Sequence, residues 1–386
     1  MLKILKQLTP LGIATAFMLL LANCGTGNAL SGTAGATPAT RIGHVFIIVL
    51  ENEDYGNSFA ANSPAPYLAT TLPAQGALLQ NYYGTGHLSN DNYISMISGQ
   101  GPNALNQTDC QIYADFIGSG PQTMVNGQAV GQGCVFPASV PTVVDQLGAA
   151  GYTWKAYMED MGNTPSREAA TCGHPALNSQ DGTQSATAAD QYATRHNPFV
   201  YFHSIIDKPV CDTSVVNLKA LDGDLQSTAT TPNYSFITPN LCHDGHDAPC
   251  ADGEPGGLVS ANTFLSEWVP KIVNSPAFRQ DGLLIITFDE SSGPQSDASA
   301  CCGEGPAANA PLPGLAGLGG GKIGALLLSP FIKPGTVSTP YNHYSMLRSV
   351  EDIFGLQYLG YASTAGQASF GTDVFTVKMP VFPAKH

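Results

Sequence analysis

Residues 281–293 read Asp-Gly-Leu-Leu-Ile-Ile-Thr-Phe-Asp-Glu-Ser-Ser-Gly, and this stretch decides the fold. Leu283 to Phe288 is an apolar run without polar alternation, which is typical of a strand buried on both faces of a sheet. Two adjacent acids, Asp289 and Glu290, follow it. Because open α/β sheets bind ligands at the carboxyl ends of their strands, both are candidate metal ligands or acid–base groups. The alternative is an exposed strand end with two solvated acids.

Apolar runs of the same kind recur along the chain and alternate with stretches of helical spacing. We expect strands at 44–50, 77–83, 152–158, 234–238 and 323–328, and helices at 66–74, 140–150, 214–225, 258–273 and 345–354. Strands that alternate with helices predict an α/β fold with a mostly parallel sheet.

Four of the expected strands end in polar side chains or are followed closely by them. These are Glu51 and Asn52, then Asn240 with Asp244 and His246, then Asp289 and Glu290, and finally His343. If the strands are parallel, all of these side chains lie along one edge of the sheet. Carboxylate, imidazole and amide groups gathered there suit one or two divalent cations, with zinc, calcium and magnesium as candidates.

A serine lies at the start of another expected helix. Apolar residues between Tyr93 and Ile97 predict a short helix that starts near Asn90, with Ser89 at its N-cap or just before it. Backbone N–H groups at such a position favour anions. Ser89 is therefore a candidate cap and also a candidate nucleophile. A serine beside divalent cations is typical of metal-assisted phosphoryl transfer.

Composition limits the class of partner. The chain has 386 residues, of which 43% are hydrophobic and 11% charged, and its formal net charge is −14. That charge argues against a nucleic-acid-binding surface. It does not exclude a phosphorylated substrate, because a bound cation can supply the local positive charge. We find no internal repeat and no domain linker after residue 40.

The N-terminus has the features of an export signal. Lys3 and Lys6 precede an apolar core, and together residues 1–24 are expected to form a signal peptide. The sequence Leu-Ala-Asn-Cys that ends at Cys24 resembles a bacterial lipobox, so the chain is either lipidated at Cys24 and tethered to a membrane or simply secreted. Residues 25–40 are small and polar and are expected to be a flexible tether. We expect an exported protein that is periplasmic, at the outer surface or secreted.

Eight cysteines follow Cys24, and an even number in an exported chain suggests disulfides. Pairing neighbours in sequence gives one of 105 possible connectivities. The expected pairs are Cys110 with Cys134, Cys172 with Cys211, Cys242 with Cys250, and Cys301 with Cys302. A thiolate zinc site is the alternative, although no paired Cys-x-x-Cys units occur.

Six motifs resemble those of the phosphoesterase family of bacterial and fungal acid phosphatases and phosphatidylcholine-type phospholipases C, within the alkaline phosphatase superfamily. They are Val49-Leu-Glu51-Asn52, His87-x-Ser89-x-x-Asn92-Tyr93, Arg195-His196-Asn-Pro-Phe, Pro239-Asn-Leu-Cys-His-Asp244-Gly-His246-Asp, Phe288-Asp289-Glu290 and Asn342-His343-Tyr-Ser-x-Leu-Arg. The resemblance extends from about residue 42 to residue 375. It implies a three-layer α/β/α fold like that of alkaline phosphatase, in a single catalytic domain at residues 41–386.

The resemblance also implies roles for individual residues. One metal would be bound by Glu51, Asn52, Asp289 and Glu290. A second metal, or the phosphate itself, would be bound by Asp244, His246 and His343. Ser89 would be the nucleophile, Asn92 would hold a phosphate oxygen, and His196 would face the substrate or leaving group. His87 is assigned to the substrate site, with an ordinary loop histidine as the alternative. The sequence departs from the family at Leu88 and Asp91, where proline is common.

The resemblance implies a metal-dependent phosphoric-ester hydrolase. We expect a monomeric phosphomonoesterase of the acid phosphatase type, acting on a phosphorylated small molecule or a phospholipid. A phospholipase C or other phosphodiesterase is the alternative within the family. A catalytically inactive surface-binding protein is the alternative from another class.

Overall fold

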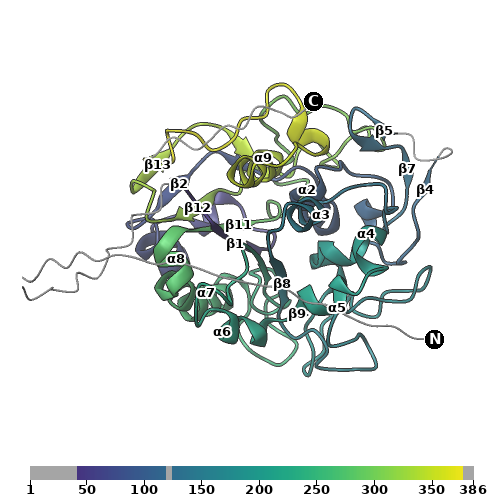
Figure 1. Cartoon of the computed structure of the whole chain (residues 1–386), viewed down its shortest axis with the longest axis horizontal. Coiled ribbons are helices and arrows are strands. Elements are labelled where there is room, and N and C mark those ends of the chain that lie inside the picture. Colours follow the sequence, from purple (N-terminus) through teal and green to yellow (C-terminus); the bar gives the residue numbers. More distant parts are fainter. Residues whose placement is uncertain (1–40, 119–123, 377–386) are drawn as a thin grey trace, which may run out of the picture. The chain divides into compact units, whose positions relative to one another are not determined.

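An eight-stranded sheet runs through the centre of the protein, with the strand order β13-β2-β12-β11-β1-β10-β8-β9 (Figure 1). The computed structural model describes residues 41–118 and 124–376, which form one compact unit. The predictions for residues 1–40, including the signal peptide, the tether and Cys24, lie outside the described residues. The strands of the sheet are β1 (His44–Leu50), β2 (Ala77–Leu79), β8 (Trp154–Met158), β9 (Val215–Asn217), β10 (Tyr234–Thr238), β11 (Gly282–Phe288), β12 (Ala325–Leu328) and β13 (Gly335–Val337).

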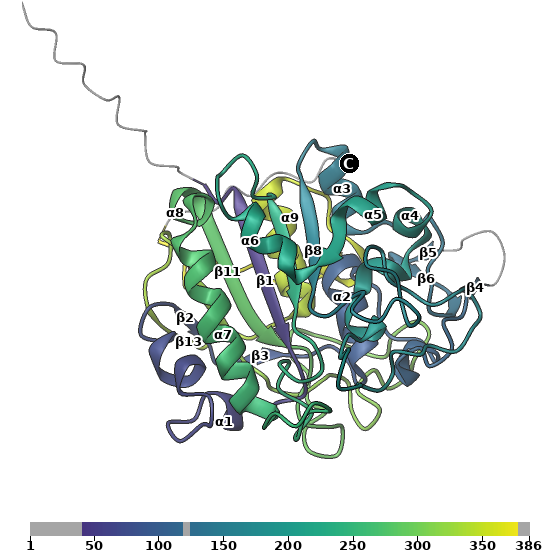
Figure 2. The same cartoon turned by 90° about the horizontal axis from the view of Figure 1, so that it is seen from below.

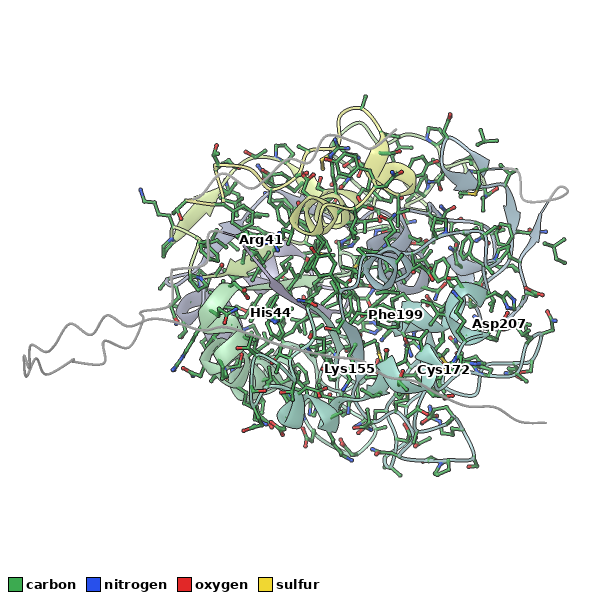
Figure 3. All side chains as sticks on the ribbon, viewed as in Figure 1. Arg41, His44, Lys155, Cys172, Phe199 and Asp207 are labelled. Atoms are coloured by element: carbon green, nitrogen blue, oxygen red, sulfur yellow. A yellow bond between two sulfur atoms is a disulfide. The ribbon has the colours of Figure 1, made fainter. Side chains whose placement is uncertain are left out.

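The sheet is mostly parallel, as the sequence predicts. β1 pairs in parallel with β10 on one side and with β11 on the other, and Ile47 lies beside Phe236 and Ile285. Every residue of β1 and β11 is buried, which explains why neither strand alternates in polarity. Figure 3 shows side chains packed around the sheet, with His44 at the start of β1.

Helices cover both faces of the sheet. α7 and α8 lie on one face, and α9 with α2 and α3 lies on the other (Figures 1 and 2). This arrangement confirms the predicted three-layer α/β/α class. The helices are α1 (Tyr55–Ser58), α2 (Ser89–Ser98), α3 (Val143–Ala149), α4 (His203–Ile206), α5 (Val210–Ser214), α6 (Leu221–Asp224), α7 (Gly257–Asn274), α8 (Pro276–Asp281) and α9 (His343–Phe354).

One strand runs against the predicted direction. β12 is antiparallel to both β11 and β2, so its carboxyl end lies at the opposite edge of the sheet from that of β11. The reason is the connection: residues 289–324 contain no helix that could cross a face of the sheet, and a parallel neighbour needs such a crossover. His343 therefore does not reach the site from the end of β12. It follows β14 (Tyr341–Asn342), which pairs with β3 (Tyr82–Tyr83).

Three predicted elements differ in detail. The helix expected at 214–225 begins as the edge strand β9, because Val215 and Val216 are β-branched and pair with β8. The helix expected at 66–74 is a short π-helical turn, Tyr67–Thr71. The strand expected at 77–83 is divided into β2 and β3. Two further small sheets pair β4 (Ile117–Gly118) with β7 (Gly131–Gln132), and β5 (Met124–Val125) with β6 (Gln128–Ala129).

All four expected disulfides are present. They join Cys110 to Cys134, Cys172 to Cys211, Cys242 to Cys250, and Cys301 to Cys302. Among the residues that the structure describes, none of the helices is long and apolar enough to span a bilayer.

Candidate active site

The acids that follow β1, β10 and β11 meet at one edge of the sheet. Backbone hydrogen bonds continue beyond the strands: the Asp289 N–H donates to the Leu50 carbonyl over 2.8 Å, and the Glu51 N–H donates to the Asp244 carbonyl over 2.8 Å. This pairing fixes three acids side by side. The prediction that parallel strand ends bring Glu51, Asp244 and Asp289 together is confirmed.

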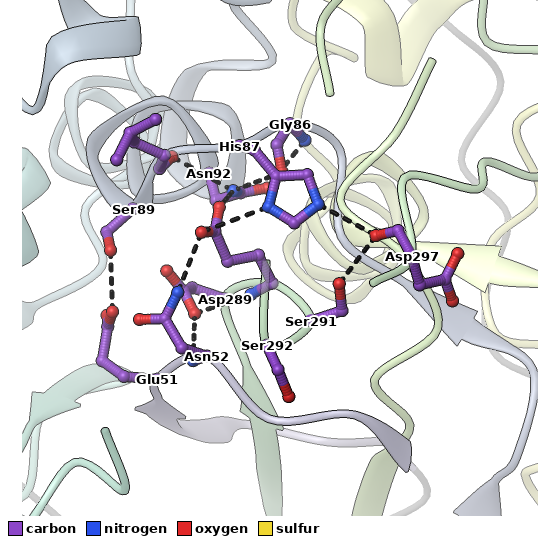
Figure 4. A network of polar contacts seen from close by, with 12 residues as sticks. Glu51, Asn52, Gly86, His87, Ser89, Asn92, Asp289, Ser291, Ser292 and Asp297 are labelled. Carbon is purple, nitrogen blue, oxygen red and sulfur yellow. Dashed lines mark hydrogen bonds and ion pairs between the residues drawn. The ribbon is translucent and has the colours of Figure 1, made fainter. Parts of the chain in front are cut away.

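Ser89 is the first residue of α2 and points at this edge (Figure 4). Its Oγ donates a hydrogen bond to Glu51 Oε2 over 2.7 Å. The sequence predicts Ser89 at the N-cap or just before it, but the N-cap residue is Leu88, which forms no side-chain capping hydrogen bond. The Ser89 hydroxyl is directed at an acid instead of at the backbone. Asp109 takes part of the capping role, since its carboxylate accepts from the Asn90 N–H over 3.0 Å.

His196 lies between two of the acids. Its Nε2 is 3.4 Å from Glu51 Oε1, and its Nδ1 is 3.7 Å from Asp244 Oδ2. The ring stacks on Tyr93, with the ring centroids 5.3 Å apart and the planes 10° from parallel. His196 therefore contacts the acid cluster directly. Tyr93 lies in one of the sequence motifs, but its role could not be predicted because its stacking partner is 103 positions away.

Glu290 is the centre of a second set of contacts, drawn in Figure 4. Its Oε1 accepts from the Asn52 side-chain amide over 2.9 Å and lies 3.2 Å from His87 Nδ1. Its Oε2 accepts from the Asn92 amide over 3.0 Å. The other ring nitrogen of His87 is 3.0 Å from the Asp297 carbonyl oxygen. The two predicted substrate residues, His87 and Asn92, thus both lie at the site and contact Glu290.

Asn92 also shapes the turn that precedes Ser89. Its Oδ1 accepts from the backbone N–H groups of Thr85 and Gly86, and its Nδ2 also donates to the Gly86 carbonyl over 2.9 Å. The amide is fully engaged within the protein and holds residues 85–88 in place. A Cβ at Gly86 would lie 2.2 Å from Asp91 Oδ1, so a larger residue here would displace the Asp91 carboxylate.

Four acids of the site are almost completely buried, with exposed fractions of 1% for Glu51, 0% for Asp244, 0% for Asp289 and 3% for Glu290. Burial raises the pKa of all four carboxyls, and for Asp289 it does so to about 6. The negative charges of Asp289 and Asp244 raise the pKa of Glu51 further. Among the described residues, their ion-pair partners are histidines only: His196 for Glu51 and Asp244, and His87 for Glu290.

Three carboxylate oxygens of these four acids have no hydrogen-bond partner although they are buried: Glu51 Oε1, Asp244 Oδ2 and Asp289 Oδ2. A buried carboxylate is costly unless a cation or a donor compensates it. The donor set of carboxylate oxygens fits a divalent cation, and the Asn52 side-chain oxygen remains available because the amide nitrogen binds Glu290. The oxygens of Glu290 are already occupied by amide and imidazole groups.

Two predicted metal-binding histidines are placed differently from the acids. His343 is buried, but its Nε2 is 2.6 Å from the Asp289 carbonyl oxygen and its Nδ1 is 3.1 Å from the Tyr82 hydroxyl. Its ring therefore braces the backbone of Asp289. The side chain of His246 is 53% exposed and lies 3.4 Å from Asp247, at the rim of the site.

Cysteine offers no alternative metal site. In the part of the chain that the structure describes, three groups of cysteine with histidine or acid could hold an ion by distance alone, and they include Cys242, Cys250, Cys301 and Cys302. All four of these cysteines are in disulfides and have no thiolate to offer.

Asp91 is the site residue that the sequence places least well. It replaces a proline that is common in the family, lies two residues after Ser89 and is 1% exposed. Both of its carboxylate oxygens are buried without a hydrogen-bond partner. Burial, with the nearby charge of Glu290, raises its pKa well above the usual value. The carboxyl packs against Gly86 instead of pointing outward.

Comparison with known proteins adds the family. The family model described as "Phosphoesterase family" matches residues 61–357. The chain belongs to the phosphoesterase family. The predicted family is therefore confirmed, over about three quarters of the sequence.

Curated relatives are about 25% identical to this chain over the aligned residues. A probable acid phosphatase of Kluyveromyces lactis is 24% identical over 321 residues, which cover 82% of this chain and 59% of that protein. An acid phosphatase of Aspergillus fumigatus is 26% identical and is covered over 55% of its length. A phosphatidylinositol-3-phosphatase of Mycobacterium tuberculosis is 25% identical, with 94% of this chain and 93% of that protein covered. The chain thus spans less than two thirds of the two fungal proteins.

Among solved structures, a protein of the alkaline phosphatase superfamily from Vibrio parahaemolyticus is similar at 12% identity with a TM-score of 0.49. The similarity covers 85% of this chain and 72% of that one.

Proposed function

We propose that this phosphoesterase is a metal-dependent phosphomonoesterase that uses Ser89 as its nucleophile. One observation carries the proposal: the Ser89 hydroxyl donates to Glu51 within a cluster of buried acids that have unpaired oxygens. A hydroxyl needs a proton acceptor and a compensating positive charge to attack a phosphate ester. The three relatives are named as phosphatases, which supports phosphomonoesters as the substrate class.

Glu51, Asp289 and Asn52 would hold a divalent cation, with Asp244 beside them across His196. When bound, this cation would supply positive charge for the phosphate oxygens and lower the pKa of the serine hydroxyl. Oxygen ligands suit magnesium or calcium, and the nearby imidazole of His196 suits zinc.

The residues of the chain would share the remaining work. Glu51 Oε2 accepts the hydroxyl proton as Ser89 Oγ forms a bond to phosphorus and the bond from phosphorus to the leaving alcohol oxygen breaks. That proton ends on the alcohol. A water molecule then attacks the phosphoserine, the bond from phosphorus to Oγ breaks, and a proton from the water returns to Oγ. His196, stacked on Tyr93, would hold the Glu51 and Asp244 carboxylates in place during both steps of the reaction.

We also propose that the protein is exported, with residues 1–24 as its signal peptide and 25–40 as its tether. Four disulfides support an oxidising compartment, since such bonds are rare in reducing cytosol. A fusion of residues 1–40 to a reporter enzyme that is active only after export tests this directly. A reporter that stays in the cytosol would contradict the proposal.

The substrate class is tested by comparing esters on the purified protein. We expect hydrolysis of p-nitrophenyl phosphate and of a phosphomonoester on a lipid, such as phosphatidylinositol 3-phosphate in vesicles. Bis-p-nitrophenyl phosphate and phosphatidylcholine should be at least about tenfold poorer in kcat/KM. A preference for either diester would assign the protein to phosphodiester chemistry instead.

A further inference from the structure

A second pocket lies beside the candidate active site but is separate from it. It has a cavity volume of about 100 Å³, and its lining includes Thr85, Glu304, Tyr344 and Tyr361. This volume is below the range of drug-sized ligand sites, so the pocket has room only for a small molecule. None of the described residues proposed above for catalysis or metal binding lines it. Thr85 forms part of the wall between the two sites, because its hydroxyl donates to Asn92 Oδ1 over 3.2 Å.

The pocket contains one carboxyl group that the rest of the protein leaves unsatisfied. Glu304 accepts a hydrogen bond from the Asn342 amide, but its Oε2 is buried and has no partner. No lysine, arginine or histidine of the described residues lies within ion-pair distance of it. Burial raises the pKa of Glu304 to about 7, although hydrogen bonds from Asn342 and from backbone groups oppose the shift. A ligand that donates hydrogen bonds and carries positive charge would stabilise this carboxylate most.

The walls of the pocket are aromatic and apolar. The Tyr344 and Tyr361 rings meet edge to face, with their centroids 5.4 Å apart and their planes at 71°. Pro306 and Pro313 line the pocket together with these rings. Aromatic faces attract cations and also pack against flat apolar groups. These walls suit a ligand with an apolar body next to its charged group.

Two other ligand classes fit less well. A metal ion needs several oxygen or nitrogen ligands, and Glu304 is the only carboxylate in the lining, while the neighbouring Cys301 and Cys302 are joined in a disulfide. An anion would meet the Glu304 charge with no cationic side chain in the lining. The remaining class is an organic cation.

We propose that this pocket binds a small organic cation, with a primary ammonium group on Glu304 and a flat apolar body against Tyr344 and Tyr361. The assignment does not depend on the proposed phosphatase reaction, because Ser89 and its acids take no part in it. Binding can therefore be measured without an activity assay.

The test uses three probes that share one ring and differ in their polar group: benzylammonium, benzyl alcohol and benzoate. Calorimetric titration of the full chain should give one benzylammonium per chain, bound about tenfold or more tightly than benzyl alcohol, with no benzoate binding. Absence of benzylammonium binding, or equal binding of the alcohol, would overturn the proposal.

Variants locate the bound cation. Glu304→Gln can still accept from Asn342 and should lower benzylammonium affinity to that of benzyl alcohol. Tyr361→Leu should lower it as well, because one aromatic wall is lost. Glu267→Gln, on the exposed face of α7, is the matched control and should leave binding unchanged. Unchanged affinity in a folded Glu304→Gln variant would place the cation elsewhere, for example on the acids around Ser89, and would overturn the proposal.

Discussion

His243 and Asp244 are neighbours in sequence, yet their side chains lie in two acid–histidine clusters of opposite character. The outer cluster consists of His243, Glu159 and Glu254. Its imidazole Nδ1 is 2.9 Å from Glu159 Oε1, and its Nε2 is 3.5 Å from Glu254 Oε2. Burial alone would lower the pKa of His243, but the two carboxylates outweigh it and raise the pKa to about 9. This cluster is electrostatically satisfied.

The inner cluster consists of Glu51, Asp244, Asp289, Glu290 and His196. It contains more acids than histidines, and burial lowers the pKa of His196 while raising those of the acids. Three of its carboxylate oxygens are unpaired. A charged site that is buried and unsatisfied costs stability, so we infer that it is kept for binding and chemistry. The outer cluster stabilises the folded protein, whereas the inner cluster destabilises it.

The largest expected effect comes from removing the proposed nucleophile. Ser89→Ala removes the hydroxyl that points at Glu51, and kcat for p-nitrophenyl phosphate should fall roughly 10³-fold or more. The matched control is Ser98→Ala, at the other end of α2, whose hydroxyl donates to the Ile94 carbonyl and accepts from the Gln100 N–H, away from the acid cluster. Its kcat should stay within about threefold of the original. Near-normal turnover in folded Ser89→Ala protein would rule out the serine mechanism.

Metal removal is the next largest effect and concerns the inner cluster alone. Excess EDTA should lower kcat about 100-fold or more, and zinc, magnesium or calcium should restore it. The unfolding temperature should fall at the same time, because an ion that binds only the folded state stabilises it. Full activity in excess chelator would contradict the metal assignment.

Neutralising one carboxylate should change the free energy of unfolding in opposite directions in the two clusters. In metal-free protein at pH 7.5, Asp289→Asn removes a buried charge but keeps an oxygen for the Asn52 N–H, so the free energy of unfolding should rise by about 1–2 kcal/mol. In metal-loaded protein the same variant should lose activity. Chemical denaturation of both forms measures the change. A loss of stability in the metal-free variant would mean that the inner cluster is satisfied after all.

The smallest expected effect is the pH dependence of the stability that the outer cluster contributes. A histidine whose pKa is raised on folding stabilises the protein below its unfolded pKa, and this stability is lost as the pH rises through the folded pKa of about 9. Glu159→Gln should therefore lower the free energy of unfolding by about 0.5–1 kcal/mol near pH 6, since the pair is partly exposed. The difference from the original protein should vanish above pH 9. A constant difference across this range would exclude ionisation of His243 as its cause.

The meeting of acids in the inner cluster can be predicted from the sequence, because parallel strands place the residues that follow them at the same edge of the sheet. β1 and β11 are uniformly apolar, and parallel pairing places the residues after them side by side, so Glu51 and Asp289 could be predicted to meet. Pairing neighbouring cysteines in sequence also predicted the four disulfides. An apolar run carries no direction, however, and the antiparallel course of β12 was missed for that reason.

Side-chain orientation was the other limit of the sequence. Periodicity could not reveal that both nitrogens of His343 are engaged by Tyr82 and Asp289, or that Asp91 turns inward onto Gly86. These contacts join segments that are far apart in the chain or depend on one rotamer. The stacking of Tyr93 on His196 was hidden in the same way.

The stereochemical course at phosphorus tests the central claim most directly. A phosphorothioate monoester made chiral with two oxygen isotopes can be hydrolysed by the metal-loaded protein in water that carries the third isotope, and the configuration of the inorganic thiophosphate determined. Attack by Ser89 followed by water is two displacements, each with inversion, so the account predicts overall retention. Overall inversion would show that water attacks the substrate directly and would contradict Ser89 as the nucleophile.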